Sequence, residues 1–138
     1  MIEAVDTSVL ILRERNPTVR AWLEPRLRAD GIAVCDFVVM EYLVGARNGR
    51  DYDTLRDALD ACHRVPVEPA DWRRAFEVQR MLAHRTGGGQ RAVTIADLLI
   101  AATAERAGHP LVHYDEDFER IAAVTGQPTS WVLPRGTA

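Results

Sequence analysis

The stretch Ala92–Asp117, AVTIADLLIAATAERAGHPLVHYDED, decides the fold class. Its first part is almost uninterruptedly apolar, and the pattern predicts a helix over Ala92–Ala107. Gly108 is the expected end of that helix, because glycine readily adopts the left-handed conformation that closes helices, and Pro110 lies just beyond it. Leu111–His113 is the short strand predicted next. A long helix that leads into an apolar strand is typical of a parallel sheet covered by helices on both faces.

The same alternation of short apolar runs and longer helical patterns extends outward to the rest of the chain. The expected strands are Ile2–Val5, Ile32–Cys35, Arg64–Val67, Leu111–His113 and an edge strand at Ser130–Leu133. The expected helices are one after Asn16 and Pro17 that Pro25 kinks or shortens, Phe37–Ala46 with Asp36 as its cap, Tyr52–Cys62, one that begins at Pro69, and Asp115–Val124. We expect a turn at Ser8–Leu12, a break at Gly49 and a flexible loop at Thr86–Gln90. The sequence therefore predicts an α/β domain with three layers, in which helices cover both faces of a parallel sheet.

The helix that begins at Pro69 should bury one apolar face. Apolar side chains recur along it at a helical spacing, and they are Trp72, Ala75, Phe76, Leu82 and Ala83. We expect these side chains to face the core.

Length and composition limit the classes of protein that fit this sequence. The chain has 138 residues, of which 47% are hydrophobic and 27% charged, as is ordinary for a single soluble globular domain over residues 1–138. Its 2 cysteines, Cys35 and Cys62, are too few for a disulfide scaffold and lack the spacing of a zinc site. No apolar run approaches the ~20 residues that cross a bilayer, and the N-terminus lacks the basic region of a signal peptide. The expected location is the cytoplasm, with no membrane association.

The chain contains no lysine, so all 17 of its basic residues are arginine. This excludes enzymes that depend on an essential lysine, which include P-loop NTPases, kinases, Schiff-base enzymes and haloacid-dehalogenase phosphatases. It also argues against a response-regulator receiver, whose acidic pocket needs a lysine. The net charge of −3 gives no general attraction to nucleic acid, so any such binding must come from a local group of arginines.

Several carboxylates occur where a charge is unfavourable. Asp6 closes the first expected strand. Glu41 is the only charge in the run FVVMEYLVGA, and Asp97 is the only charge in AVTIADLLIAATA. A buried carboxylate loses its hydration, so it needs a compensating partner. Each of these acids could also have a purely structural role. Asp6 could cap a turn, and Glu41 could point to solvent or pair with an arginine. Asp97 could be stabilised by the dipole at the start of its helix.

The expected topology brings carboxylates from distant segments together. In an open parallel sheet, ligands bind beyond the carboxyl ends of the strands. Asp6 and Asp115 each follow a strand, and Glu41 and Asp97 lie about one turn into helices near the same edge. Like charges that converge repel one another, and a hard divalent cation such as Mg²⁺ or Mn²⁺ relieves the repulsion through oxygen ligands. Such an ion polarises a phosphate and activates water, which is nuclease chemistry.

These segments resemble a known family. The motifs DTSVLI, MEYLVGA, IADLLIAATA and HYDEDFERIA, in this order over residues 2–132, resemble the PIN domain and, within it, the VapC toxins of bacterial toxin–antitoxin systems. The resemblance implies a parallel sheet with strand order 3-2-1-4-5. It also implies an Mg²⁺- or Mn²⁺-dependent endoribonuclease that cuts tRNA or rRNA loops and so halts translation and growth. The implied partners are the RNA substrate, a cognate VapB-type antitoxin and a second copy of the chain in a homodimer.

The resemblance implies a role for each matching residue. The catalytic acids would be Asp6, Glu41, Asp97 and Asp115. Asp6, Asp97 and Asp115 would bind the metal directly, whereas Glu41 and Asp117 would act through water. Ser8 matches the hydroxyl residue that often supports the first acid, and Asp117 matches a fifth acid with a supporting role. Capping of a helix start remains an open role for the acids at positions 115–117.

Two arginines are candidates for RNA binding. Arg85 and Arg91 flank the glycine loop that leads into the helix with Asp97, so they could contact the RNA backbone, although plain surface charge is equally open. His113 stands where many relatives carry threonine, and we expect it to be a strand-end residue without a catalytic role.

Other functions remain as alternatives. One is a structure-specific or RNA-processing nuclease without an antitoxin, and another is a catalytically silent binding subunit. The triplet Asp6-Thr7-Ser8 resembles the catalytic loop of aspartic proteases, but those enzymes are all-β and the helical patterns of this chain exclude them.

Overall fold

The strands form one parallel sheet. In the computed structural model, which describes residues 1–85 and 87–138, they are β1 (Glu3–Val5), β2 (Ile32–Cys35), β3 (His63–Val65), β4 (Leu111–His113) and β5 (Thr129–Trp131). Their order across the sheet is β3-β2-β1-β4-β5, and all neighbours are parallel. This confirms the predicted α/β class and the strand order that the resemblance implied.

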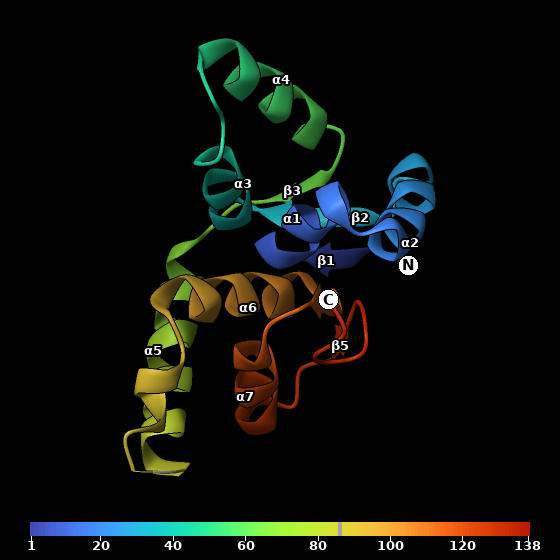
Figure 1. Cartoon of the computed structure of the whole chain (residues 1–138). Helices are drawn as coiled ribbons and strands as arrows, with labels where there is room; N and C mark the ends of the chain where they lie inside the picture. The colour runs from blue at the N-terminus through green and yellow to red at the C-terminus, as the bar shows by residue number, and fades with distance from the viewer. Residues whose placement is uncertain (86) are drawn as a thin grey trace.

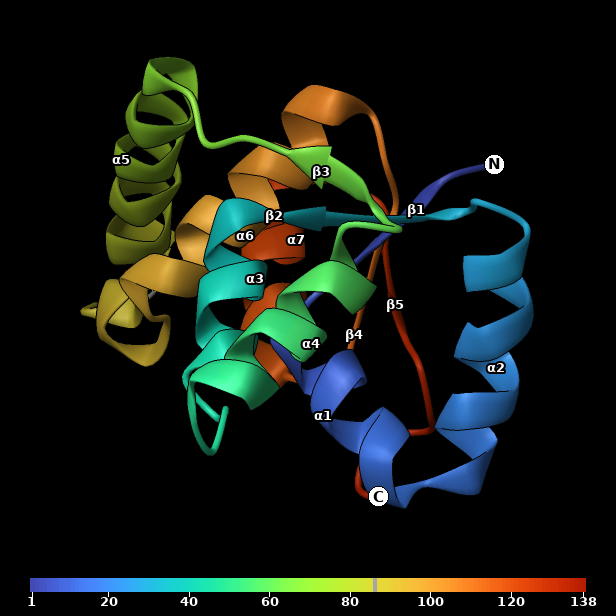
Figure 2. The same ribbon diagram turned by 90° about the horizontal axis from the view of Figure 1, so that it is seen from above.

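Helices cover both faces of this sheet. They are α1 (Thr7–Arg15), α2 (Pro17–Arg28), α3 (Asp36–Leu43), α4 (Gly49–Leu59), α5 (Pro69–Arg85), the 3₁₀ helix η1 (Gly89–Ala92), α6 (Ile95–Ala107) and α7 (Glu116–Thr125). Helices α1 to α4 lie on one side of the sheet and α5 to α7 on the other (Figure 1). The view from above has α1, α3 and α4 in front of the strands and α6 and α7 behind them (Figure 2). The predicted three layers are confirmed.

The strand order reverses between β1 and β4. Ala4 pairs with Ala33 of β2 on one side and with Leu111 of β4 on the other. The chain runs from β1 outward to β3 and then returns to β4 on the opposite side of β1. Such a switch point leaves a crevice at the carboxyl ends of the two strands, where open α/β sheets bind ligands. Asp6 follows β1 and Asp115 follows β4 closely, so both acids lie at this point.

Helix α6 is the central helix of its layer. It packs against α5, α7 and the strands β2 and β3, and its residues 97–104 are all buried. Each large apolar side chain that is fully buried stabilises the fold by about 1.5–3 kcal/mol. The helix is therefore firmly anchored, and its first turn gives Asp97 a rigid support.

The predicted turn at Ser8–Leu12 is wrong, because these residues belong to helix α1. Residues that branch at Cβ lower the intrinsic preference of this segment for a helix. Burial of Val9, Leu10 and Leu12 in the core outweighs that preference.

The inward face of α5 differs from the predicted one. Trp72 and Phe76 were expected inside, but they are 47% and 69% exposed, and Ala83 is half-buried. The side chains that α5 buries are Asp71, Ala75, Val78 and Leu82. A buried aspartate takes part in this stripe because it pairs with Arg106 of α6, with Nε and Oδ1 2.9 Å apart. The apolar pattern alone could not reveal that pair.

Several boundaries also differ from the prediction. Asn48 caps α4 by accepting a hydrogen bond from the Asp51 N–H at 2.9 Å, so Gly49 begins a helix where a break was expected. Helix α3 starts at Asp36 itself, rather than after it, and ends at Leu43. Helix α2 continues through Pro25.

The two outer strands lie slightly earlier in the chain than expected. Strand β3 ends at Val65, since Pro66 has no N–H to donate, and β5 begins at Thr129. Of the predicted loop, Thr86 lies outside the described residues, and η1 begins at Gly89. Within the described part of the chain, no helix is both long enough and apolar enough to span a bilayer.

Candidate metal centre

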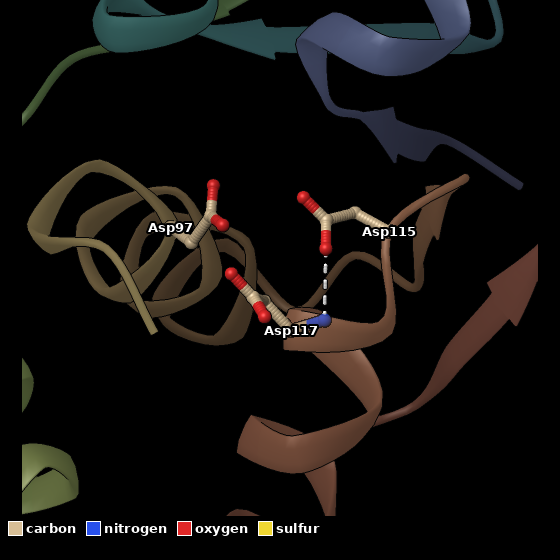
Figure 3. Close-up of side chains that lie close together, drawn as sticks. All are labelled: Asp97, Asp115 and Asp117. Carbon is tan, nitrogen blue, oxygen red and sulfur yellow. Dashed lines mark hydrogen bonds between the residues drawn. The ribbon is translucent and has the colours of Figure 1, made fainter. Parts of the chain in front are cut away.

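Carboxylates from α6 and from the start of α7 converge beyond the carboxyl end of β4. Asp97, Asp115 and Asp117 each offer one oxygen that lies within 4.8 Å of the others. Figure 3 shows the three side chains pointing toward one another. Asp97 is buried, whereas the two acids of the α7 segment are only half-buried, so a ligand can reach the group from solvent.

Thr94 holds Asp97 in place at the start of α6. The Thr94 side chain caps the helix, because its Oγ1 accepts a hydrogen bond from the Asp97 N–H at 3.1 Å. A cap of this kind satisfies one of the free N–H groups at a helix start. Since a threonine serves as the cap, the Asp97 carboxylate is available to face the cluster. Thr94 was not singled out from the sequence, although its spacing of three residues before an acid is a known capping signal.

Asp115 and Asp117 form the beginning of α7. Asp115 is the cap residue, and its Oδ1 accepts a hydrogen bond from the Asp117 N–H at 2.9 Å (Figure 3). Arg120 donates from Nη1 to Oδ1 of Asp117 at 2.7 Å. The capping role that the sequence left open is therefore present. It uses one oxygen of Asp115, and it also fixes the direction of that carboxylate.

Asp6 lies at the end of β1 and is only 4% exposed. Ser8 donates a short hydrogen bond from Oγ to Oδ1 of Asp6. The same Oγ accepts a hydrogen bond from the Tyr114 N–H at 2.9 Å. Ser8 therefore ties the end of β1 to the end of β4 and orients the Asp6 carboxylate.

Glu41 reaches the same edge of the sheet from α3. Its side chain is exposed, and an exposed position was one of the two structural explanations for Glu41 that the sequence allowed. Thr7 donates a hydrogen bond from Oγ1 to Oε1 of Glu41 at 2.7 Å, a contact that sequence reasoning missed. The charge of Glu41 is close enough to Asp6 to raise the pKa of that residue.

The tightest group differs from the set expected to bind metal directly. The expectation was direct contact for Asp6, Asp97 and Asp115, and contact through water for Glu41 and Asp117. In the structure, Asp117 completes the group within 4.8 Å, whereas Asp6 approaches it from the neighbouring strand.

Burial and mutual repulsion make two of these acids weak. Burial is the main cause that raises the pKa of Asp6 to about 7, and the charges of Asp115 and Glu41 add to it. Burial also raises the pKa of Asp97 to about 8, together with the charge of Asp115 and a hydrogen bond to Asp117. Hydrogen bonds from Ser8 partly offset the shift of Asp6. The ionised cluster is unfavourable unless a cation neutralises it.

The donor atoms fit a hard divalent cation. Within residues 1–85 and 87–138, the group holds carboxylate oxygens and no histidine or cysteine. Oxygen donors suit Mg²⁺ and Mn²⁺, which keep several waters, and an open site leaves room for those waters and for a phosphate oxygen.

The fold and this acidic group agree with a comparison to known families. A family model described as "PIN domain" matches residues 4–124. The chain belongs to the PIN domain family. The resemblance inferred from the motifs is confirmed, and the matched residues include the strands β2 to β4, most of β1, the acids and most of α7, whereas β5 lies beyond them.

Named relatives of this PIN domain cover more than nine-tenths of its length. It is 49% identical to Ribonuclease VapC18 of Mycobacterium tuberculosis over 99% of both chains. It is 45% identical to Ribonuclease VapC21 of the same species over 91% of both chains. Its fold matches the crystal structure of DNA-bound VapBC from Salmonella typhimurium with a TM-score of 0.76, covering 96% of this chain and 100% of that chain. At 18% identity, that likeness shows the fold alone.

The two arginines expected at the RNA surface of the PIN domain are both exposed. Arg85 donates from Nη1 to the carbonyl oxygen of Ala123 at 2.8 Å, so it also links α5 to α7. The Arg91 guanidinium lies over Gly88, which has a positive φ of 80°. In the described part of the chain, neither arginine pairs with a carboxylate.

We expect the metal-free PIN domain to lose about 2–3 kcal/mol of stability between about pH 6.5 and about pH 8.5. In the unfolded chain Asp6 and Asp97 ionise near 3.8, but the folded protein retains their protons to about 7 and about 8. The folded state therefore binds more protons in this window, and its stability falls as the pH rises. Thermal unfolding in chelator across the window measures the effect.

A double variant, Asp6→Asn with Asp97→Asn, is the control for this pH dependence and should flatten the curve. Burial lowers the pKa of His113, so its contribution has the opposite sign, but the lower limit of about pH 6.5 keeps that contribution small, because an unfolded histidine is at most half-protonated above it. Equal slopes for parent and double variant would contradict the assignment.

Proposed function

We propose that this chain is an endoribonuclease toxin of a VapBC toxin–antitoxin pair, which hydrolyses phosphodiester bonds in tRNA or rRNA loops and halts translation and growth. The observation that carries the proposal is the acidic group at the switch point of a PIN domain whose relatives are named VapC ribonucleases. Loops are suitable substrates because their bases are unpaired and their backbone can be held in an extended path.

Mg²⁺ or Mn²⁺ is the cofactor in this proposal. Asp97, Asp115 and Asp117 would hold the ion, and Asp6 and Glu41 would support it through water. When bound, such an ion polarises a phosphate and activates water. The protein contributes the fixed carboxylates: Ser8 orients Asp6, and Thr7 holds the exposed Glu41 through a hydrogen bond. The Glu41 carboxylate would accept a hydrogen bond from a water in the site.

Arg85 and Arg91 bind the RNA backbone in this proposal, because they are exposed cations next to the loop before α6. Replacing either by glutamine should weaken RNA binding and reduce the salt slope by about 0.7 for each lost phosphate contact. Mn²⁺ affinity should stay unchanged. Filter binding across a salt series measures both effects.

Arg50→Gln is the matched control for the arginine variants, because Arg50 is an exposed arginine of α4. Its loss should leave the salt slope intact. If Arg85→Gln and Arg91→Gln also bind and cut RNA like the parent, the glycine loop is not part of the RNA surface.

Two protein partners belong to the proposal. A VapB-type antitoxin would inhibit by inserting an arginine among the acids, because a cluster of carboxylates attracts a bidentate cation. A second copy of the chain would form a homodimer, which the exposed Trp72, Phe76 and Ile95 around a shallow apolar groove support. Analytical ultracentrifugation of the purified chain measures its mass in solution and so tests for the homodimer.

A cleavage assay tests the proposed function. A mixed RNA pool and a matched DNA pool are incubated with the protein in chelator, in Mg²⁺ and in Mn²⁺, with and without the product of the neighbouring reading frame. The expected result is RNA cleavage that needs the metal and stops with the partner. Cleavage of DNA, or cleavage that the partner does not affect, would favour a processing or structure-specific nuclease. A folded protein that binds RNA without cutting it would favour the silent binding subunit.

A further inference from the structure

His113 is a fully buried histidine directly behind the acidic group. It ends β4 and is 0% exposed. Its ring lies 4.9 Å from the Trp131 ring and 5.3 Å from the Phe118 ring, measured between centroids. Its carbonyl oxygen accepts a hydrogen bond from the Val132 N–H at 2.8 Å, so the neighbouring strand fixes its backbone as well.

The imidazole makes one hydrogen bond, and it is to Asp115. Nδ1 accepts from the Asp115 N–H at 3.1 Å. A nitrogen that accepts carries no proton, so the neutral ring has its proton on Nε2. Within the described residues Nε2 has no hydrogen-bond partner, and the Glu119 carboxylate lies 3.8 Å from it. Thr129 of β5 holds that carboxylate through a hydrogen bond of 2.7 Å to Oε2.

The chain between β4 and α7 is thus held by two side chains. The Tyr114 N–H donates to Ser8, and the Asp115 N–H donates to His113. The Asp115 carbonyl oxygen accepts from the Phe118 N–H at 3.2 Å and its Oδ1 accepts from the Asp117 N–H. Because the backbone N–H and carbonyl of Asp115 are both hydrogen-bonded, its backbone is fixed. This fixes the direction of its Cα–Cβ bond, so the side chain points into the acidic group.

We propose that His113 is a positioning residue, whose Nδ1 fixes the Asp115 backbone and thereby aims the Asp115 carboxylate into the metal centre. This inference rests on the proposed metal site and goes beyond the expectation that His113 is a strand-end residue without a catalytic role. Partners behind a metal ligand orient it, and their loss typically weakens metal binding by about 10–100-fold. An apolar residue in the same cavity would fill the space and leave the Asp115 N–H without its acceptor.

Mn²⁺ binding to the metal-free protein, followed by calorimetry and by the electron paramagnetic resonance of the bound ion, tests this role without any cleavage assay. His113→Leu should weaken Mn²⁺ binding by about 10–100-fold. His113→Asn should restore most of the affinity, because its amide oxygen occupies nearly the place of Nδ1. His113→Gln carries the same group one bond farther out and should resemble the leucine variant.

Trp131→Phe is the control for packing, because it alters the wall of the His113 cavity and leaves the hydrogen bond to Asp115 intact. It should lower the melting temperature with unchanged Mn²⁺ affinity. The inference is overturned if His113→Leu binds Mn²⁺ like the parent, or if the asparagine variant binds no better than the glutamine variant. A parent protein that binds no Mn²⁺ would instead overturn the proposed metal site itself.

Discussion

Replacing Asp97 by asparagine is expected to abolish RNA cleavage while leaving the metal-free fold as stable as the parent or more stable. Cleavage should fall by at least about 100-fold, since even changes behind a metal ligand reach that size. Stability should not fall, because burial and the charge of Asp115 make the ionised Asp97 unfavourable and raise its pKa to about 8. The amide keeps the shape of the side chain without the charge. Thermal unfolding in chelator at about pH 8.5, where the carboxylate is ionised, measures the difference.

The opposite sign would identify a structural role for Asp97. If its carboxylate mainly stabilised the start of α6, the substitution would lower the free energy of unfolding by about 1–3 kcal/mol. Mg²⁺ should stabilise the parent by about 2.7 kcal/mol at 100 times its dissociation constant, and the variant by less. Asp57→Asn, which removes an exposed carboxylate of α4, is the control for the change in net charge and should alter neither property.

Replacing Arg106 by methionine should lower the free energy of unfolding by about 3 kcal/mol, because it leaves a buried carboxylate without its charged partner. Asp71 is 1% exposed, and its oxygens accept from Arg106 at 2.9 and 3.1 Å and from the Glu68 N–H at 2.8 Å. Without the guanidinium, that carboxylate keeps a single backbone donor. Urea unfolding measures the loss. RNA cleavage at a temperature where the variant is folded should be unchanged, because Arg106 lies in the last turn of α6 and Asp97 in the first.

Arg74→Met is the matched control, because the carboxylate that Arg74 pairs with is not buried. Arg74 of α5 pairs with Glu105 of α6 at 2.7 Å, but both side chains are more than a quarter exposed. Solvent screens such a pair, so its loss should lower the free energy of unfolding by less than about 1 kcal/mol. Equal losses in the two variants would mean that burial does not distinguish these ion pairs. A second change, Asp71→Asn, should restore stability to Arg106→Met. That result would support the unpaired, buried Asp71 carboxylate as the cause of the loss.

The sequence was sufficient for the presence of the strands and of helix α6, although α6 begins at Ile95 rather than at Ala92, which belongs to η1. The observed bounds match the predicted ones for the strands Ile32–Cys35 and Leu111–His113. A short apolar run between two helical patterns fits a buried strand better than any other element. The C-terminal ends of α6 and α7 were also marked correctly by Gly108 and Gly126, which adopt positive φ of 73° and 74°. The positions of Asp6 and Asp115 followed from the strands that precede them.

The orientation of side chains could not be predicted in the same way. Helical periodicity places Trp72 and Phe76 on one stripe of α5, but the helix instead buries the stripe that contains Asp71, whose partner Arg106 lies on another helix. Similarly, the proximity of Asp117 to Asp97 depends on how α7 starts against α6. Local sequence determines that each segment is a helix, whereas contacts between segments determine what each helix presents.

The pairing of Ala4 with Leu111 has a consequence for synthesis of the protein on the ribosome. The first acid is made near the beginning of the chain, but its neighbours at positions 97, 115 and 117 are made after more than two-thirds of it. Until β4 has emerged and joined β1, Asp6 has no acidic neighbours from α6 and α7, and the nascent chain has no complete site. Pairing between strands so distant in the chain is also intrinsically slow. An enzyme that attacks the RNA of the translation machinery would therefore remain harmless while that machinery is still making it.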